Sequence, residues 1–362
     1  MRYLFAGGGT GGHIFPAIAI ADEIRKMDTM AEILFVGAKG RIEEKIVPSN
    51  NYRLETIDIA GINRSNMLKN IGLPLKFLGA LKKCRDIIRE FKPDVAVGTG
   101  GFVCGPVIYQ ANKSRVPTLI QEGNAYAGKT IRFLSSKSDK VVINFEETIK
   151  YLKRKDNVLK IAHPIRSSLK RVNKQEALEF FKLPADRKTI LIFGGSQGAH
   201  GINEAVSSAA EKLYSAGMNI IWQAGKSDSA NAQKEFSGLS DRIRIFEFID
   251  RMDMAYSASD LVVCRAGITS IMELSFMKTP SILIPLPGSA ENHQEMNARS
   301  FESKGASKVV LQHEAKEKLY DEILKIINDD VEIREMSSSA ANFADPLAAE
   351  KIAKEVKLLA EK

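Results

Sequence analysis

The residues most able to do chemistry gather in a glycine-rich run that ends in a histidine. Gly7–Gly12 holds five glycines in six positions, and His13 follows it directly. Tyr3–Ala6 has the composition of a buried strand, and Ile14–Met27 has apolar residues at helical spacing. A strand, a glycine turn and a helix place bare backbone N–H groups at the positive helix end, where phosphate or another electron-rich oxygen binds. The same helix end disfavours imidazolium, so we expect a neutral His13 that can act as a general base.

The glycine run alone leaves the ligand open. It also matches the dinucleotide-binding fingerprint, although such a match is weak by itself. The next expected strand, Glu32–Gly37, lacks the acidic residue at its end that holds the ribose of NAD. Lys39 and Arg41 suit a 2′-phosphate instead, so an NADP-dependent oxidoreductase stays an alternative. A purely structural turn is less favoured, because such a turn does not need so many glycines.

A second buried strand and glycine turn occurs in the other half of the chain. Thr189–Phe193 is the apolar run, and Gly194–Gly198 follows with Ser196 at its centre. We expect this turn to form a second phosphate-binding site. Its Gly-x-Ser-x-Gly spacing also matches the nucleophile elbow of α/β-hydrolases, and Asp260 and His293 follow in the order of that triad. The presence of two glycine-loop modules and the lack of a His-Gly-Gly-Gly segment argue against a hydrolase.

Several polar residues have both a structural and a binding interpretation. For Asn124 the alternatives are to cap the next helix or to hydrogen-bond a sugar hydroxyl. For Arg166 they are to pair with a surface carboxylate or to bind a diphosphate. Thr269 and Glu273 are four residues apart, which puts them on one face of the helix after the Asp260–Cys264 strand. Glu273 is then a helix-dipole partner or a ligand for the two hydroxyls of a ribose.

The sequence does not predict a metal site. The proline-bounded loop Pro285–Glu295 carries side chains that can bond a sugar, and it also contains Glu291, His293 and Glu295. Alternate residues of this kind converge only in a strand, so we treat their spacing as accidental. No Asp-x-Asp pair occurs to hold a metal on a diphosphate. If the substrate is a nucleotide sugar, arginine and helix ends must therefore replace magnesium.

The order of elements predicts an α/β fold of two Rossmann-like, doubly wound domains with a cleft between them. Strands and helices alternate up to about residue 161 and then restart, with further strands expected at Val116–Gln121, Lys140–Asn144, Asn219–Gln223, Arg242–Phe246, Ser281–Leu286 and Ser307–Leu311. We expect an N-terminal domain at 1–162 and a C-terminal domain at 163–345. Residues 346–362 are expected to form a helix that crosses back to the N-terminal domain and packs across the junction.

Composition limits the partners. The 362 residues carry a net charge of +8, from 52 basic and 44 acidic residues, which favours an anionic partner. Aromatic residues make up only 7% and do not interleave with a basic cluster, which argues against nucleic acid. Three scattered cysteines predict buried thiols in a reducing compartment. The first strand leaves no room for a signal peptide, so we expect a cytoplasmic protein with at most peripheral membrane contact.

One basic segment has two interpretations. Ile62–Arg85 combines six basic residues and an apolar run with no acidic residue. It forms either a core-facing helix with a solvated basic side, or a patch that inserts apolar side chains among anionic lipid headgroups. The residues of the candidate patch are Leu75, Lys76, Phe77, Leu78 and Lys82.

Taken together, five motifs resemble those of the MurG family, the peptidoglycan N-acetylglucosaminyltransferases of GT-B fold. They are Gly9–His13, Gly100–Pro106, Gly194–Ala199, Cys264–Glu273 and Asn292–Ala298, so the resemblance spans the whole chain. It implies transfer of GlcNAc from UDP-GlcNAc to the C4 hydroxyl of MurNAc in lipid I, with inversion, to give lipid II. It further implies a metal-independent enzyme without a cofactor that binds the anionic inner-leaflet surface of the cell membrane. UDP-GlcNAc 2-epimerases, glycolipid synthases and a non-catalytic sugar-nucleotide binder remain alternatives.

The resemblance also implies roles for single residues, with the donor mainly against the second domain. Glu273 would hold the ribose and the backbone of Ile249 the uracil, and the other donor contacts would come from Thr10, Gly11, Gly12, Asn124, Arg166, Ser196, Ile268, Thr269 and Gln294. Among these, Ser196 and Arg166 would bind the diphosphate. His13 would be the base for the acceptor hydroxyl, and its alternative role is to brace the glycine turn. Two positions depart from the family pattern: His163 replaces the usual Asn, and Gly123 replaces the common Gln.

Overall fold

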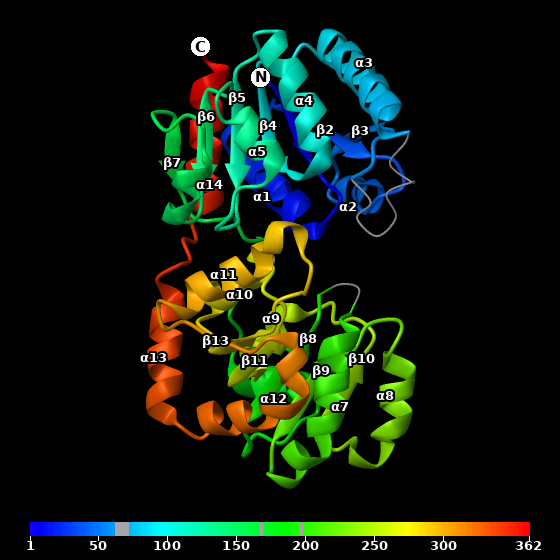
Figure 1. Ribbon diagram of the computed structural model, residues 1–362, viewed down its shortest axis with the longest axis vertical. Coiled ribbons are helices and arrows are strands. Elements are labelled where there is room, and N and C mark those ends of the chain that lie inside the picture. Colours follow the sequence, from blue (N-terminus) through cyan, green and yellow to red (C-terminus); the bar gives the residue numbers. More distant parts are fainter. Residues whose placement is uncertain (62–71, 167–168, 196–197) are drawn as a thin grey trace. The chain divides into compact units, whose positions relative to one another are not determined.

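The computed structural model describes residues 1–61, 72–166, 169–195 and 198–362. The first ten residues of the basic segment, 62–71, and the candidate Ser196 lie outside the described residues. Contacts divide the chain into two compact units (Figure 1). Unit 1 comprises Met1–Arg166 and Asp345–Lys362, and unit 2 comprises Ser167–Ala344.

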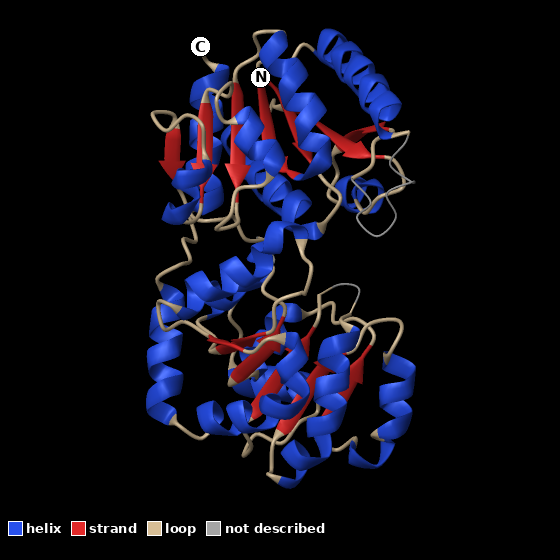
Figure 2. Ribbon diagram, viewed as in Figure 1, coloured by secondary structure: helices blue, strands red, loops and turns tan. Residues whose placement is uncertain are grey.

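Unit 1 is built on a parallel sheet with the strand order β3-β2-β1-β4-β5-β6-β7, drawn in red in Figure 2. Its strands are β1 (Arg2–Gly7), β2 (Glu32–Ala38), β3 (Arg53–Ile57), β4 (Val95–Gly100), β5 (Thr118–Glu122), β6 (Lys140–Ile143) and β7 (Val158–Lys160). The sequence pattern does not predict β3 or β7, which are the two edge strands. Both are short and mostly only partly buried, so their apolar pattern is weak.

Each face of this sheet is covered by helices. In β1, Tyr3 and Phe5 enter one core cluster while Leu4 and Ala6 enter the other, as the alternation of a strand requires. A strand covered on both faces reads as a continuous apolar run, which is why the sequence predicts β1 well. The helices of the unit are α1 (Gly11–Met27), α2 (Glu43–Ser49), α3 (Leu73–Phe91), α4 (Gly101–Lys113), α5 (Lys129–Leu134), η2 (Glu146–Tyr151) and α14 (Ala348–Ala360).

The C-terminal helix α14 completes the core of unit 1. Its buried residues Ile352, Val356 and Leu359 lie in the same cluster as residues of α1 and β1. Lys140 of β6 also forms an ion pair with Glu355 of α14. The chain therefore leaves unit 1, forms unit 2, and returns to bury the apolar face of its last helix in the first sheet.

Unit 2 has a second parallel sheet, in the order β10-β9-β8-β11-β12-β13. Its strands are β8 (Thr189–Phe193), β9 (Asn219–Gln223), β10 (Ile243–Phe246), β11 (Leu261–Cys264), β12 (Ser281–Leu283) and β13 (Lys308–Val309). Its helices are α6 (Lys174–Phe180), α7 (His200–Ser215), α8 (Ser229–Glu235), η3 (Ser237–Leu239), α9 (Met252–Ala258), α10 (Ile268–Met277), η4 (Ala290–Asn292), α11 (His293–Glu302), α12 (Gln312–Ile327) and α13 (Asp330–Ala341). No helix in the described part of the chain is long and apolar enough to cross a bilayer.

Both sheets reverse their strand order at one point. In unit 1, β1 pairs with β4 as well as β2, and in unit 2, β8 pairs with β11 as well as β9. Ligands of open parallel sheets bind beyond the carboxyl ends of the strands at such a reversal. The glycine turns after β1 and β8 lie at these two points, so the fold places the predicted binding turns where this kind of sheet binds its ligands.

Candidate functional site

The first glycine turn leads into helix α1 earlier than the sequence analysis predicts. The helix starts at Gly11 and not at Ile14, so Gly11, Gly12 and His13 form its first turn. Thr10 is the N-cap residue, but its side chain makes no capping hydrogen bond. The sequence pattern does not indicate this start, because glycines carry no apolar side chain that would show helical spacing. The correction places His13 on the helix and its ring at the N-terminal turn.

A backbone carbonyl fixes the protonation pattern of His13. The Nδ1 atom lies 3.1 Å from the carbonyl oxygen of Thr99, at the end of the neighbouring strand β4. A carbonyl only accepts, so this bond requires that Nδ1 carry the proton, and the lone pair of the neutral ring is then on Nε2. The hydroxyl of Thr99 donates back to the carbonyl of His13 at 2.7 Å. Both roles weighed for His13 are therefore compatible, because Nδ1 braces the turn and Nε2 has the electron pair of a base.

Glycines allow the ring to lie this close to β4. A Cβ atom on Gly100 would fall 2.8 Å from Nδ1 of His13, and one on Gly101 would fall 2.2 Å from the carbonyl oxygen of Gly8. Both glycines also have positive φ angles, of 101° and 78°. The two glycine turns of unit 1 thus meet each other around His13.

A buried glutamate that the sequence analysis missed holds the first turn. Glu43 of α2 is fully buried, and its Oε1 accepts from the N–H of Gly9 at 2.9 Å and of Ala38 at 3.3 Å. A Cβ on Gly8 would fall 1.9 Å from the same oxygen. Because Glu43 lies 34 residues beyond Gly9, no local spacing signals the contact. The N–H of Gly9 is occupied by a carboxylate, which makes this part of the turn unsuitable for a phosphate.

Asn124 is not a helix cap. The next helix, α5, has Gly128 as its N-cap, so the capping interpretation is wrong. Instead Oε1 of the buried Glu122 accepts from both the backbone N–H and the side-chain amide of Asn124, each at 2.9 Å. Its other oxygen accepts from the N–H of Gly128 at 2.9 Å. The NH₂ group of Asn124 is thus directed at Glu122, which fixes the orientation of its amide.

His163, where the resemblance leads us to expect asparagine, is a buried, neutral ring. Its Nδ1 lies 2.9 Å from the side-chain amide nitrogen of Gln121, and its backbone N–H donates to the side chain of Asn144 at 2.9 Å. Burial lowers the pKa of His163 to about 3, and the nearby His13 acts in the same direction. The substitution is thus accommodated by a hydrogen bond to Gln121, without a charge beside His13.

Arg166, the last residue of the N-terminal part of unit 1, lies near the start of α1. Its guanidinium carbon is 5.7 Å from the ring centroid of Phe15. Stacking on an aromatic face restrains an arginine while leaving N–H groups at the edge of the guanidinium to donate. Unit 1 therefore brings the candidates Thr10, Gly11, Gly12, His13 and Arg166 to the beginning of one helix.

In unit 2, Glu273 and Thr269 lie on α10, which follows β11. Neither residue caps the helix, and Glu273 is beyond its first turn, so the capping and dipole interpretation is wrong. Glu273 is 2% exposed, and its Oε2 accepts from the hydroxyl of Tyr256 at 3.0 Å. The hydroxyl oxygen of Thr269 is buried and has no hydrogen-bond partner among the described residues. A buried carboxylate and an unsatisfied hydroxyl on one helix face form a suitable polar site for a ligand.

Ile249 lies in the loop after β10, where its backbone is already partly occupied. Its N–H donates to Oε1 of Gln223 at 2.8 Å, and the amide of Gln223 donates to the carbonyl of Gly195 at 2.9 Å. Gln223 is buried at the end of β9. It therefore joins the Ile249 loop to the glycine turn after β8. The N–H of Ile249 is thus already bonded within unit 2.

Two further residues shape the carboxyl edge of this sheet. Oε1 of Gln294, on α11, accepts from the N–H of Leu286 at 3.0 Å, so its NH₂ group is the part suited to donate to a sugar. Arg265, which follows β11, is 7% exposed and bonds the carbonyls of Ile284 and Pro285 and the side chain of Gln312. Burial lowers the pKa of Arg265 to about 10, and at neutral pH the guanidinium stays positive. Its neutral partners do not compensate that charge.

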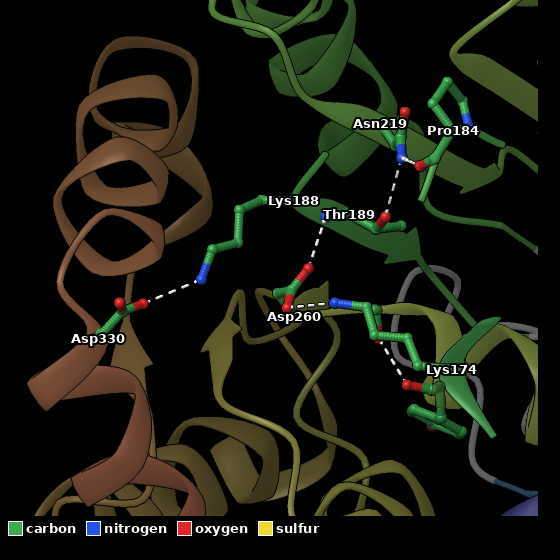
Figure 3. A network of polar contacts seen from close by, with 9 residues as sticks. Lys174, Pro184, Lys188, Thr189, Asn219, Asp260 and Asp330 are labelled. Carbon is green, nitrogen blue, oxygen red and sulfur yellow. Dashed lines mark hydrogen bonds and ion pairs between the residues drawn. The ribbon is translucent and has the colours of Figure 1, made fainter. Parts of the chain in front are cut away.

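Asp260, the acid of the alternative hydrolase triad, bonds the backbone at the amino edge of the sheet. Asp260 directly precedes β11, and its Oδ2 accepts from the N–H of Thr189, the first residue of β8, at 2.8 Å (Figure 3). Lys174 also pairs with this carboxylate. Ser196 comes after the opposite end of β8. Asp260 therefore lies at the amino end of β8, and the length of this five-residue strand, on the order of 15 Å, separates it from the carboxyl end at Phe193.

No cluster of three or more His, Cys, Asp or Glu side chains in the described chain has the arrangement of a metal site. The three histidine and glutamate positions of the Pro285–Glu295 loop accordingly do not converge.

Comparisons with known proteins identify the class to which this fold and these sites belong. Residues 3–143 match the glycosyltransferase family 28 N-terminal domain, and residues 189–352 match the glycosyltransferase family 28 C-terminal domain. The chain is therefore a glycosyltransferase with the two Rossmann-like domains of the GT-B fold.

Its relatives narrow this class to one family. The chain is 38% identical to the UDP-N-acetylglucosamine–N-acetylmuramyl-(pentapeptide) pyrophosphoryl-undecaprenol N-acetylglucosamine transferase of Parabacteroides distasonis, over 100% of this chain and 99% of the relative. It is 40% identical to the enzyme of the same name from Thermoanaerobacter sp., over 99% of each chain. The crystal structure of Acinetobacter baumannii MurG has 26% identity, 99% coverage of both chains and a TM-score of 0.79. The chain belongs to the MurG family.

A UDP-GlcNAc 2-epimerase from Neisseria meningitidis, solved with UDP-GlcNAc bound, resembles this chain with a TM-score of 0.71. It is 13% identical, over 99% of this chain and 100% of the epimerase. At that identity the likeness shows a common fold and no common reaction.

Proposed function

We propose that this protein transfers GlcNAc from UDP-GlcNAc to the C4 hydroxyl of MurNAc in lipid I and forms lipid II with inversion at the anomeric carbon. The observation that carries the proposal is the full-length identity of 38–40% to enzymes with that name. This identity favours the transfer reaction over the reactions of epimerases, glycolipid synthases and NADP-dependent oxidoreductases. It also favours an enzyme over a non-catalytic sugar-nucleotide binder.

Unit 2 is proposed to hold the nucleotide. Glu273 bonds the ribose hydroxyls, with Thr269 and Ile268 beside it at the start of α10. The carbonyl of Ile249 accepts from uracil, and the NH₂ group of Gln294 donates to the GlcNAc. Each of these residues follows the carboxyl end of a strand, which is the expected ligand side of a parallel sheet.

The diphosphate is proposed to bind the glycine turn after β8, with Ser196 and Arg166. The buried charge of Arg265 supports an anionic ligand at this edge, because its own hydrogen bonds go to neutral oxygens. Positive groups and backbone N–H groups stabilise the charge that develops on departing UDP. The role of Thr10, Gly11, Gly12 and Asn124 is to contact the sugar from unit 1.

His13 is proposed to be the general base. Its Nε2 takes the proton of the C4 hydroxyl while that oxygen attacks C1 of GlcNAc, and the bond from C1 to the β-phosphate oxygen breaks. UDP leaves with the electron pair, and the imidazolium later releases the proton to solvent. The bond from Nδ1 to the Thr99 carbonyl supports this role, since the same carbonyl stabilises the imidazolium that forms.

We also propose that α3 binds the anionic cytoplasmic face of the membrane. Leu75, Phe77 and Leu78 are 75%, 44% and 62% exposed, which is unusual for three large apolar residues so close together. Lys76 and Lys82 are exposed on the same helix. Apolar insertion and lysine attraction act together on a lipid surface. Since residues 62–71 are not described, the proposal rests on the α3 part of the basic segment.

The deciding experiment combines radiolabelled UDP-GlcNAc with a short-chain lipid I analogue, without added metal. The wild type should form labelled lipid II, whereas conversion of UDP-GlcNAc to UDP-ManNAc without acceptor would refute the transferase proposal. His13→Ala should lower turnover by about 10²–10⁴ and leave the affinity for UDP-GlcNAc unchanged. His313→Ala, at an exposed histidine of α12, is the control. A normal rate for His13→Ala would rule out the base assignment and leave the overall reaction standing.

A further inference from the structure

We infer that Tyr256 is a positioning residue that orients the carboxylate of Glu273 for the ribose and so contributes to selection of ribonucleotides. The inference rests on the proposed binding of UDP-GlcNAc by unit 2. Its basis is the hydrogen bond of 3.0 Å between the Tyr256 hydroxyl and Oε2 of Glu273, in which both residues are 2% exposed.

The surroundings of the tyrosine restrain its ring. Tyr256 lies on α9, which precedes β11 in the chain, and Glu273 lies on α10, which follows it. The bond therefore joins these two helices directly. The ring of Tyr256 packs edge-on against Phe193, with centroids 5.9 Å apart and planes at 87°. Phe193 is the last residue of β8, directly before the glycine turn. The phenol is therefore fixed by the core, and its hydroxyl has a defined position relative to that turn.

The hydroxyl in turn restrains the carboxylate. A glutamate has three side-chain torsions, and the last of them is broad, so the plane of an unrestrained carboxylate is poorly defined. A donor on Oε2 fixes that plane. Because a carboxylate has about four acceptor directions, one bond to Tyr256 is compatible with bonds to the 2′ and 3′ hydroxyls of a ribose. Such a diol requires two acceptors at a fixed angle, which makes orientation important.

Tyr256→Phe is a suitable test because it removes the hydroxyl and keeps the ring on Phe193. Binding of UDP and of 2′-deoxy-UDP is measured by calorimetry for the wild type and this variant. The wild type should bind UDP about tenfold more tightly, since a hydroxyl bonded to a charged acceptor is lost in the deoxy compound. The variant should bind UDP about fivefold to tenfold more weakly and 2′-deoxy-UDP within about twofold of the wild type. Its discrimination between the two ligands should therefore be largely lost.

Two further variants separate the possible failures. Tyr214→Phe is the matched control, because the hydroxyl of Tyr214 also bonds a carboxylate, that of Asp241 at 3.1 Å, at the C-terminal end of α7. It should leave both affinities unchanged. Glu273→Gln should abolish the discrimination.

Each result has one consequence. Equal affinity of the wild type for both ligands would overturn the ribose role of Glu273, and the role of Tyr256 with it. Discrimination that Glu273→Gln abolishes but Tyr256→Phe preserves would overturn the inference about Tyr256 alone. An equal loss of both affinities in Tyr256→Phe would also overturn it, because that pattern indicates general disruption of unit 2.

Discussion

Replacing Glu43 with alanine probes how the first glycine turn is held in place. Glu43 is fully buried beneath Gly8 and Gly9 and accepts two backbone hydrogen bonds, of 2.9 Å from Gly9 and 3.3 Å from Ala38. Alanine removes the acceptor from both N–H groups and leaves space that water does not readily reach. The turn then loses the contact that fixes it against α2.

The structure allows the size of this effect to be worked out. A buried N–H left without an acceptor costs about 1–3 kcal/mol, and the longer bond from Ala38 belongs near the lower end, so the two together give about 3 kcal/mol. For a unit of this size, 1 kcal/mol corresponds to about 2–4 °C in the unfolding midpoint, which predicts a fall of roughly 6–12 °C. Glu43→Gln retains an oxygen for both donors and should cost about 1 kcal/mol, because its NH₂ group replaces Oε2, which has no partner among the described residues.

Thermal unfolding of the full chain is the assay, with and without UDP. UDP should raise the unfolding midpoint of unit 2, because it binds the folded form of that unit. The midpoint that UDP leaves unchanged therefore reports on unit 1. Glu44→Ala is the control, since Glu44 is the exposed neighbour of Glu43 in the first turn of the same helix. If Glu43→Ala lowers the midpoint no more than Glu44→Ala does, the carboxylate does not hold the turn and the reasoning is refuted.

Two further predictions concern the membrane surface and pH. Changing Leu75, Phe77 and Leu78 together to serine should abolish sedimentation with anionic vesicles and leave the unfolding midpoint unchanged, because all three are exposed; sedimentation equal to that of the wild type would contradict the membrane role of α3. Burial lowers the pKa of His163 from 6.5 to about 3, so between these values the unfolded chain binds a proton that the folded chain excludes. The unfolding free energy should therefore fall by about 1.4 kcal/mol per pH unit well below the unfolded-state pKa. His163→Asn should remove this part of the slope in urea unfolding between pH 7 and pH 5, and an unchanged slope would contradict it.

The parts of the fold that the sequence predicts are those with strong local patterns. Strands β1, β8 and β9 are buried on both faces and read as apolar runs, and the glycines after β1 and β8 mark the binding turns. Edge strands such as β3, with the sequence Arg-Leu-Glu-Thr-Ile, lack such a run. The start of α1 was missed for a related reason, because its first two residues are glycines.

The candidate site was predictable as a set of turns and not as a set of contacts. The sequence locates His13, but only the packing of β4 beside β1 brings the Thr99 carbonyl to its Nδ1. Likewise Asn124 is conspicuous in sequence, and two of its hydrogen bonds go to Glu122, two residues away, and not to the helix that follows. Glu43, Gln223 and Tyr256 carry no local signal. Their partners Gly9, Gly195 and Glu273 lie 34, 28 and 17 residues away in the chain, and spacing gives no information at that range.

The acidic residues of this chain show how position in a parallel sheet separates structural from functional groups. Asp94, Asp139 and Asp260 each precede a strand and accept from the first N–H of the neighbouring strand, at 2.7, 2.8 and 2.8 Å. These N–H groups lie at the amino edge, where the ladder of a parallel sheet leaves them unpaired, and an aspartate satisfies them. All three carboxylates are therefore occupied with the backbone, and the same relation explains why Asp260 is no part of a triad.

The buried glutamates have the opposite location. Glu122 ends β5, Glu43 follows β2 and Glu273 follows β11, so all three belong to the carboxyl edges of their sheets, and none is more than 4% exposed. Burying a carboxylate is costly unless hydrogen bonds compensate it, and loops at this edge supply them through N–H and hydroxyl groups. These bonds hold the loops in place, and the loops lead to or carry His13 on α1, Asn124 and the proposed nucleotide contacts. In a chain of this fold, we therefore expect an acid before a strand to satisfy the backbone, and a buried acid after one to position or bind a ligand.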